Sequence, residues 1–405
     1  MPDKLPPKDD LIFVLNSGSS SLKFGLYHRA AVDGAATDEA VTDGAVTDGA
    51  VTDGAVTDEV ALLTGSADGV GHGNGSLQIR SSTGEILVKR ADILESQDHA
   101  LATIAEEIRK HVPAAPVAVG HRVVHGGPHL LTHQPITPQV LRQLRSAVHF
   151  APVHIPQALS LIAASQSLFP SATQFACFDD VFHQTMPEVA SHLPLPQRYF
   201  DEGVRRYGFH GLSYESLVHH FGAKLPPRAI FAHLGNGASL CALRHRQSID
   251  TTMGLTPTGG IPMGTRSGDL DPGVFVYLLR TQQLGADALE DLINHQSGLF
   301  ALSCGESDVK SLEERARAKD QRASLALNVF VTAVRKAIGA YAALLGGVDL
   351  LVFTGGIGEH SDYVRSGVTD GLEFLGLTAD KIKIIPAQEE QQIARHCRSM
   401  MGQRG

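Results

Sequence analysis

Apolar and polar positions along the chain alternate with the short period of strands in some segments and with the longer period of helices in others. Two segments, residues 12–23 and 230–241, share one pattern: an apolar strand, a tight turn of Gly, Ser or Asn, and a second strand. The matching residues Leu22 and Leu240 are more than half of the chain apart, which excludes a short-period repeat. The pattern therefore predicts two copies of one domain plan, with two unrelated hairpins as the alternative.

The periodicity of apolar positions in the rest of the chain predicts the fold class. We expect a hairpin at 76–90 and strands at 117–120, 174–178, 349–353 and 381–385. We expect helices at 98–111, 138–149, 156–168, 272–284, 286–295, 307–318 and 321–345, after Gly358, and from Glu389. Because strands and helices alternate throughout, the chain is expected to be an α/β protein.

Residues 30–60 depart from this pattern. The five residues Val-Thr-Asp-Gly-Ala recur from Val41, and the tract contains almost no large apolar side chain that a core could bury. We interpret it as an inserted, solvated loop.

Composition narrows the class of protein. A chain of 405 residues is long enough for two domains, and its net charge of −9 argues against a general nucleic-acid-binding protein. The four cysteines form no Cys-x-x-Cys pair, so we expect neither disulfides nor a zinc site, which fits a reducing compartment. The first ten residues lack an apolar signal-peptide core, and Arg335 and Lys336 interrupt the apolar stretch 323–345. We therefore expect a cytoplasmic protein without membrane contact.

Several polar residues follow apolar strands, where α/β active sites gather. Arg122 comes directly after the strand at 117–120, and its planar fork suits a carboxylate or a phosphate; a structural ion pair is the alternative. Asp179 ends the strand at 174–178. Arg266 lies in a loop flanked by glycines, for which a plain surface loop is the alternative. His210 lies between an aromatic residue and a glycine, although an isolated histidine is more often structural.

Glycine-rich turns supply the other requirement of phosphoryl transfer. The chain has no GxxxxGK[ST] motif and no strand-borne GxGxxG motif, so phosphate contacts are expected from the two Gly/Ser hairpins and from residues 355–358. Backbone N–H groups in such turns can approach anionic oxygens closely. Phosphoryl transfer depends on alignment and on cationic stabilisation of the transferring group, and these residue types meet that need.

Seven longer motifs resemble the acetokinase family. They are NSGSSSLKF at 16–24, GHRVVHGG at 120–127, FDDVFHQTMP at 178–187, YGFHG at 207–211, HLGNGAS at 233–239, MGTRSGDLDPG at 263–273 and FTGGIGEHS at 353–361. The resemblance runs from Leu11 to the C-terminal region. It implies a duplicated actin-like (ribonuclease H-like) kinase fold, an active site in the cleft between two domains, and a homodimer. We accordingly expect one domain of residues 1–180 plus 387–405, and a second of residues 181–386 that carries most nucleotide contacts and the dimer interface.

The resemblance also implies the reaction ATP + acetate ⇌ ADP + acetyl phosphate, with Mg²⁺, or Mn²⁺ in its place. By matching position, Arg122 would hold the acetate or acetyl phosphate, and Asp179 would accept a proton or orient the acyl group. His210 and Arg266 would stabilise the transferring phosphoryl group, and His154 would be another active-site histidine.

Three further sets of residues follow from the resemblance. The acyl pocket would be lined by Val124, Val153, Phe209 and Pro257. The nucleotide would be contacted by Ser19, Ser21, Lys23, His233, Leu234, Gly235, Asn236, Gly237, Asp308, Val309, Lys310, Gly356, Ile357, Gly358, Glu359 and His360. The magnesium ion would be held by Asn16 and Glu389.

The chain departs from the family pattern at four places. Ile155 stands where the family usually has Asn, Asp180-Val181 where it often has Thr-Ala, and residues 256–262 differ from its common loop. Lys310 replaces a common arginine and lacks its planar fork, so nucleotide affinity or base preference would change. None of these departures removes a core charged residue.

Two other functions remain open. The small side chain of Val124 favours acetate, but one methylene is worth only about 1–3 kcal/mol, so a propionate or butyrate kinase of the same family is the nearest alternative. An actin-like or Hsp70-like protein that uses ATP to switch between binding states is the second. An inactive homologue would not be expected to retain all of the charged residues.

Overall fold

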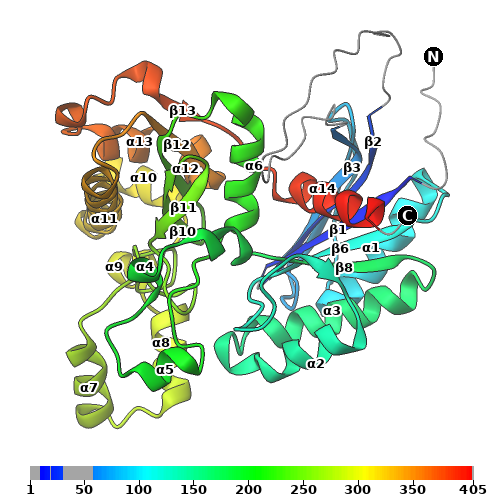
Figure 1. Ribbon diagram of the computed structural model, residues 1–405, viewed down its shortest axis with the longest axis horizontal. Coiled ribbons are helices and arrows are strands. Elements are labelled where there is room, and N and C mark those ends of the chain that lie inside the picture. Colours follow the sequence, from blue (N-terminus) through cyan, green and yellow to red (C-terminus); the bar gives the residue numbers. More distant parts are fainter. Residues whose placement is uncertain (1–9, 19, 31–57, 404–405) are drawn as a thin grey trace, which may run out of the picture. The chain divides into compact units, whose positions relative to one another are not determined.

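The computed structural model describes residues 10–18, 20–30 and 58–403, and contacts within the chain divide it into two compact units (Figure 1). Unit 1 comprises Met1–His121, Ser160–Phe175 and Ile393–Gly405. Unit 2 comprises Arg122–Leu159 and Ala176–Gln392. The domain boundaries expected from the sequence remain a prediction.

The strands form two mixed sheets. The first has the order β5-β4-β3-β2-β1-β6-β8-β7, and the second β11-β10-β9-β12-β13. The bounds are β1 (Ile12–Ser17), β2 (Ser21–Arg29), β3 (Glu59–Asp68), β4 (Ser76–Ser81), β5 (Ile86–Ala91), β6 (Ala118–Val123), β7 (Gln134–Pro135), β8 (Thr173–Phe178), β9 (Arg228–Leu234), β10 (Ala238–Arg244), β11 (Gln247–Thr251), β12 (Leu350–Thr354) and β13 (Ile382–Ile384).

The two hairpins predicted from the matching pattern are the centres of the two sheets. β1 pairs antiparallel with β2 and parallel with β6. β9 likewise pairs antiparallel with β10 and parallel with β12. The order β3-β2-β1-β6-β8 in the first sheet therefore corresponds to the order β11-β10-β9-β12-β13 in the second. The prediction of two copies of one plan is confirmed.

The helices occupy the following bounds. They are α1 (Gln97–His111), α2 (Pro138–Ser146), α3 (His154–Leu168), α4 (Glu188–Ser191), α5 (Gln197–Asp201), α6 (Gly211–Phe221), α7 (Pro272–Thr281), α8 (Ala286–His295), α9 (Gly298–Ser303), α10 (Val309–Arg317), α11 (Gln321–Leu345), α12 (Gly355–His360), α13 (Asp362–Thr369) and α14 (Glu389–Gly402). The predicted helices are confirmed to within a few residues. The pattern did not predict α4, α5, α6 or α9, and α12 begins at Gly355, earlier than expected.

Unit 1 has an apolar core in which α1 covers β2 and β3. Phe13, Phe24 and Leu63 from the strands and Ile104 from the helix are buried together. The sequence did not predict β3, which pairs with both β2 and β4. Its segment lacks a clear alternation because Gly65 and Ser66 interrupt the apolar positions.

The 30–60 tract falls largely outside the described residues, but its two ends are described. The backbone N–H of Ala30 donates to the carbonyl oxygen of Asp58 at 2.9 Å. Arg395 of α14 pairs with the Asp58 carboxylate at 2.7 Å, and Arg398 pairs with Glu59 at 2.8 Å. The two strands that flank the tract are thus joined to each other and to α14.

Unit 2 is built around α11. Asp320 caps its start by accepting from the N–H of Ala323 at 3.2 Å, and Gly346, with φ of 73°, ends it as predicted. In the part of the chain that the structure describes, α11 is the one helix long and apolar enough to span a membrane. It packs against α9, α10, α13 and β10, and is a core helix of this unit.

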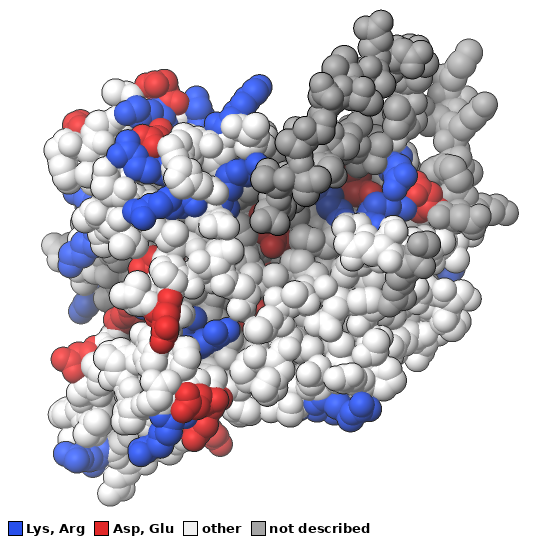
Figure 2. Space-filling model, in the orientation of Figure 1, with Lys and Arg blue, Asp and Glu red and all other residues white. Residues whose placement is uncertain are grey.

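The surface carries charged side chains of both signs, and the four cysteines all lie in the described part of the chain. Figure 2 shows acidic and basic side chains interspersed on the face it presents. All four cysteines are free: Cys177, Cys241 and Cys397 are buried and Cys304 is exposed.

Candidate active site

The centre of the candidate site is an ion pair at the ends of two neighbouring strands. Arg122 lies near the end of β6, and Asp179 directly follows β8. Arg122 Nε donates to Asp179 Oδ2 at 2.9 Å, and Nη2 donates to the same oxygen. The other oxygen, Asp179 Oδ1, is buried and has no hydrogen-bond partner among the described residues. Arg122 therefore does form an ion pair, as the alternative interpretation predicted. Asp179 Oδ1 is still available to a ligand.

Burial and charge act against each other in this pair. Burial lowers the pKa of Arg122, but the charges of Asp179 and Glu389 outweigh it and raise that pKa above its ordinary value. Burial raises the pKa of the Asp179 carboxyl, and the nearby Arg122 opposes the shift. The arginine therefore stays charged at all physiological pH values.

His210 is held at the start of α6, next to Asp179. Its backbone is left-handed, with φ of 61°, and the following N–H of Gly211 donates to the Asp179 carbonyl oxygen at 2.8 Å. A Cβ on Gly211 would lie 2.3 Å from that oxygen, so only glycine lets α6 begin there. His210 Nδ1 lies 2.8 Å from Ser239 Oγ, and its ring stacks on His233 at 4.2 Å.

Arg266 reaches the same place from a loop that is braced by the turn between α8 and α9. Its carbonyl oxygen accepts from the N–H of Met263 at 3.0 Å, and its Nη1 donates to the Pro257 carbonyl oxygen at 3.2 Å. A Cβ on Gly237 would lie 3.2 Å from His210 Nε2 and 3.5 Å from Arg266 Nη1. Arg266 and one ring nitrogen of His210 thus converge beside the glycine turn of the β9–β10 hairpin.

The cationic groups shift one another's pKa values. Burial and the charge of Arg122 lower the pKa of Arg266 to about 10. Burial, followed by the charges of Arg266 and Arg122, lowers the pKa of His154 to about 4. Burial, together with His233 and the two arginines, lowers the pKa of His210 well below its ordinary value. Both histidines are therefore neutral at pH 7, whereas both arginines are charged.

All five predicted catalytic residues therefore belong to unit 2 and interact there. Of the predicted acyl-pocket residues, Phe209 and Pro257 are buried, and Val124 and Val153 are half-buried. Val124 packs against the apolar core of unit 2.

The predicted nucleotide residues of unit 2 lie on the β9–β10 turn, on α10 and on α12. Two of them have structural tasks that the sequence did not predict. Glu359 Oε1 accepts from the N–H groups of Gly355 and Ala387, each at 3.0 Å. Asp308 caps α10 by accepting from the N–H of Ser311 at 2.8 Å. By contrast, Gly356, Lys310 and His360 are exposed.

The predicted residues of unit 1 lie on the β1–β2 hairpin. Asn16 is buried and stands opposite Lys23 in the register, and Ser21 begins β2. Ser19 is outside the described residues. The amide oxygen of Asn16 and the carboxylate of Glu389, which begins α14, are hard oxygen ligands of the kind that Mg²⁺ prefers. Each residue is thus of a type that fits that ion; Asn16 belongs to unit 1 and Glu389 to unit 2, and the magnesium site remains a prediction.

Sequence reasoning missed a second buried pair beside the first. His125 Nδ1 lies 2.8 Å from Asp180 Oδ2, and both side chains are almost fully buried. The same oxygen accepts from the N–H of Gly126 at 3.2 Å. The pair joins the loop after β6 to the loop after β8, and so supports Arg122 and Asp179. Both residues lie inside motifs already quoted, GHRVVHGG at 120–127 and FDDVFHQTMP at 178–187, but nothing in the sequence indicated that they meet.

Sequence reasoning also missed Tyr214 and Ser239. Tyr214 Oη lies 2.6 Å from Ser239 Oγ, which in turn contacts His210. All three side chains are buried.

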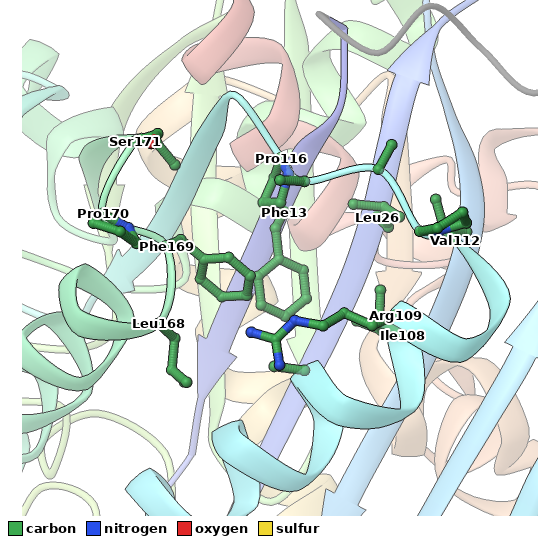
Figure 3. A pocket seen from close by; sticks show the side chains of 15 residues that line it. Phe13, Leu26, Ile108, Arg109, Val112, Pro116, Leu168, Phe169, Pro170 and Ser171 are labelled. Carbon is green, nitrogen blue, oxygen red and sulfur yellow. The ribbon is translucent and has the colours of Figure 1, made fainter.

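A cavity of about 170 Å³ lies elsewhere, in unit 1. Figure 3 shows Phe13 and Phe169 side by side in it, with Arg109 at its edge. It contains none of the predicted site residues and is therefore not the candidate active site.

The fold and the site together define a class: a kinase with a duplicated, actin-like α/β fold and a buried arginine–aspartate centre. The acetokinase family model matches residues 11–401, and the chain belongs to that family, whose enzymes are phosphotransferases with a carboxyl group as acceptor.

Relatives and solved structures agree with this assignment. An acetate kinase of Methylocella silvestris is 36% identical over 97% of this chain and 98% of its own length. A propionate kinase of an Enterobacter species is 38% identical over 92% of this chain and 87% of its own. The crystal structure of Porphyromonas gingivalis acetate kinase has a TM-score of 0.78 at 32% identity, covering 97% of this chain and all of that one. A propionate kinase structure from Francisella tularensis has a TM-score of 0.81 at 30% identity, covering 96% and 100%.

Proposed function

We propose that the chain is an acetate kinase that transfers the γ-phosphoryl group of ATP directly and reversibly to acetate. The observation that carries this proposal is the assembly of Arg122, Asp179, His210 and Arg266 in one unit, with His210 Nε2 and Arg266 Nη1 converging beside Gly237. Such a site meets the need of a reaction whose catalysis is mainly alignment and charge stabilisation.

Arg122 binds the carboxylate substrate in this proposal. A guanidinium group has five N–H donors and can serve two carboxylates at once. Asp179 orients it, and the buried Oδ1 of Asp179 is available to an acyl group or a proton. Because burial raises the pKa of Asp179, its carboxyl is a better proton acceptor than an exposed aspartate.

His210 and Arg266 stabilise the transferring phosphoryl group. The positive charge of Arg266 and the Nε2 atom of the neutral His210 both lie beside Gly237, where oxygens of the transferring group would lie. Asn16 and Glu389 would hold Mg²⁺, which neutralises phosphate charge when it is bound. The turn residues 233–237 and the start of α12 would contact ATP or ADP.

Acetate is the preferred acid in this proposal, and propionate is the alternative. Val124 has a small side chain, which favours a small acid, and each added methylene would change specificity by about 10-fold to 200-fold. Propionate kinases among the relatives and the solved structures support the alternative.

The decisive experiment is acyl phosphate formation with ATP and Mg²⁺, trapped by hydroxylamine, with acetate, propionate and butyrate in parallel. Product with acetate and less with longer acids is the expected result. The largest kcat/KM with propionate would identify a propionate kinase. ATP hydrolysis that no acid stimulates would instead favour a nucleotide-switched binding protein.

Direct transfer has its own test. A chiral γ-phosphate should reach the product with inverted configuration, because a single in-line displacement inverts phosphorus. Net retention would exclude the direct mechanism.

We also propose that the chain forms a cytoplasmic homodimer through unit 2. α7 exposes the apolar side chains of Val274, Val276, Tyr277 and Leu279, which a partner surface would cover. Light scattering should give twice the chain mass, and Tyr277→Glu should reduce it to that of one chain.

A further inference from the structure

The phosphoryl-binding histidine belongs to a chain of buried hydroxyl groups. Tyr214 Oη lies 2.6 Å from Ser239 Oγ, and Ser239 Oγ lies 2.8 Å from His210 Nδ1. Tyr214 and Ser239 have no exposed surface. Water therefore cannot replace either contact. Each proton of these three side chains must be accepted by another buried group of the protein.

The proton positions follow from the number of donors. Tyr214 is protonated, since burial raises its pKa well above the ordinary value, and its oxygen accepts from the backbone N–H of His233. Among the described residues, the other hydrogen-bond partner of the Tyr214 hydroxyl is Ser239 Oγ, which is left to accept its proton. Ser239 then has its own proton to donate, and its neighbour is His210 Nδ1. His210 Nδ1 must accept, so the single proton of the neutral imidazole is on Nε2.

We propose that Tyr214 and Ser239 are positioning residues that hold His210 in the tautomer with its proton on Nε2. This inference rests on the proposed function. Nε2 is the ring nitrogen beside Gly237 and Arg266 Nη1. The hydroxyl chain thus aims an N–H, and not a lone pair, at the place where phosphoryl oxygens gather.

The opposite tautomer would be unfavourable for both the Tyr214 hydroxyl and the His210 imidazole. With its proton on Nδ1, His210 would donate to Ser239, and Ser239 would donate to Tyr214. The hydroxyl proton of Tyr214 would then be buried without an acceptor, and a lone pair would face the phosphoryl oxygens. In other proteins a carboxylate that bonds one ring nitrogen of a histidine fixes its tautomer and ring orientation. Here the two hydroxyl groups of Ser239 and Tyr214 have that role.

The structure offers a matched control in Ser248. Its Oγ lies 2.8 Å from His183 Nδ1, and Ser248 is as fully buried as Ser239. The other nitrogen, His183 Nε2, is already bonded to the Phe209 carbonyl oxygen at 3.0 Å. Ser248→Ala therefore removes the same type of hydroxyl–imidazole contact in the same unit without touching His210.

The kinetic test compares Ser239→Ala, Ser239→Thr, Tyr214→Phe and Ser248→Ala. Ser239→Ala should lower kcat about 10-fold to 100-fold and leave the KM values for acetate and ATP within about twofold, since the lost donor acts in the transition state. Ser239→Thr should restore most of kcat, Tyr214→Phe should lower it less, and Ser248→Ala should leave it within about twofold. Equal effects of Ser239→Ala and Ser248→Ala on kcat would overturn the proposal.

A second measurement needs no active enzyme and reads the tautomer in the unaltered chain. Two-bond ¹H–¹⁵N correlation spectra of the full chain labelled with [¹⁵N]histidine identify each neutral tautomer, and His210→Gln assigns the signal. The proton on Nε2 supports the proposal, and a proton on Nδ1 overturns it. If the unaltered chain phosphorylates no acid, the proposed function fails while the tautomer still decides the geometry.

Discussion

Two arginine–aspartate pairs in unit 2 have the same chemistry and opposite surroundings. Arg122 and Asp179 have side chains that are 15% and 0% exposed, whereas those of Arg228 and Asp349 are 40% and 27% exposed. In the exposed pair, hydrogen bonding to Arg228 lowers the pKa of Asp349. In the buried pair, burial raises the pKa of Asp179 despite its arginine. Solvent access, and not the partner, decides the direction of the shift.

This difference in burial distinguishes the Arg122–Asp179 pair of the candidate active site from the Arg228–Asp349 pair, which has a structural role. Arg228 also donates to the Gly346 carbonyl oxygen at 2.7 Å, so the exposed pair joins β9 to the segment before β12. Water can solvate both of its charges if the pair breaks. The buried charges of Arg122 and Asp179 have only each other and their close neighbours, which makes an incoming anion a valuable partner.

The largest expected effect is on activity. Arg122→Ala should lower kcat/KM for acetate by a factor on the order of 10³ or more, because the carboxylate loses its buried cation. Arg228→Ala should change it less than about twofold. Steady-state assays of acyl phosphate formation make the comparison, and a loss below tenfold for Arg122→Ala would contradict it.

The next effect is on stability. Asp179→Asn removes the carboxylate that Arg122 contacts directly in the buried site and should lower the free energy of unfolding by about 3–5 kcal/mol. Asp349→Asn should cost less than about 1 kcal/mol, since water replaces the lost partner. Urea titrations of both variants test this, and equal losses would refute the contrast.

The two carboxyl groups should give stability opposite pH dependences. The folded-state pKa of Asp349 is lowered, so its contribution is present above the unfolded value of about 3.9 and is lost as pH falls below it. The folded-state pKa of Asp179 is raised, so the folded state binds more protons and its contribution to stability declines as pH rises above about 3.9. The differences in unfolding free energy between the parent and each asparagine variant should therefore change with pH in opposite directions. Parallel changes would show that the partner, and not burial, sets the sign.

The smallest effect is that of salt. Raising ionic strength from 0.1 to 1 M shortens the Debye length from about 10 to 3 Å and screens exposed charges. The cost of Asp349→Asn should shrink by a few tenths of a kcal/mol, while the cost of Asp179→Asn should stay constant. Thermal unfolding at both salt concentrations measures the two changes.

The parts of the structure that could be predicted from the sequence are those that depend on residues close together in the chain. The repeat of one strand–turn–strand pattern around Leu22 and Leu240 was sufficient to predict the duplicated sheets. The helix from Gln321 to Leu345 was predicted because its period, its Asp320 cap and its Gly346 end all lie within it or beside it.

What the sequence could not predict is which distant residues meet. Asp179 reaches Arg122 across 57 positions, and Ser239 reaches His210 across 29. Their residue types favoured a phosphoryl-transfer site, but the sheet brings them together. The structural tasks of Glu359 and Asp308 were missed for a related reason: a carboxylate that caps a backbone N–H has the same sequence signature as one that binds a ligand.

The hydrogen bond between Ala30 and Asp58 has a consequence for the gene. The tract between them repeats Val-Thr-Asp-Gly-Ala in tandem, and tandem coding repeats gain or lose whole units when a replicating strand slips. Each such event would lengthen or shorten the tract by one repeat, between two residues, Ala30 and Asp58, that are hydrogen-bonded to each other. For a flexible segment between two joined points, doubling the number of residues costs only about 0.6 kcal/mol in closure entropy. Lineages of this enzyme could therefore differ in size at this point and still share one working fold.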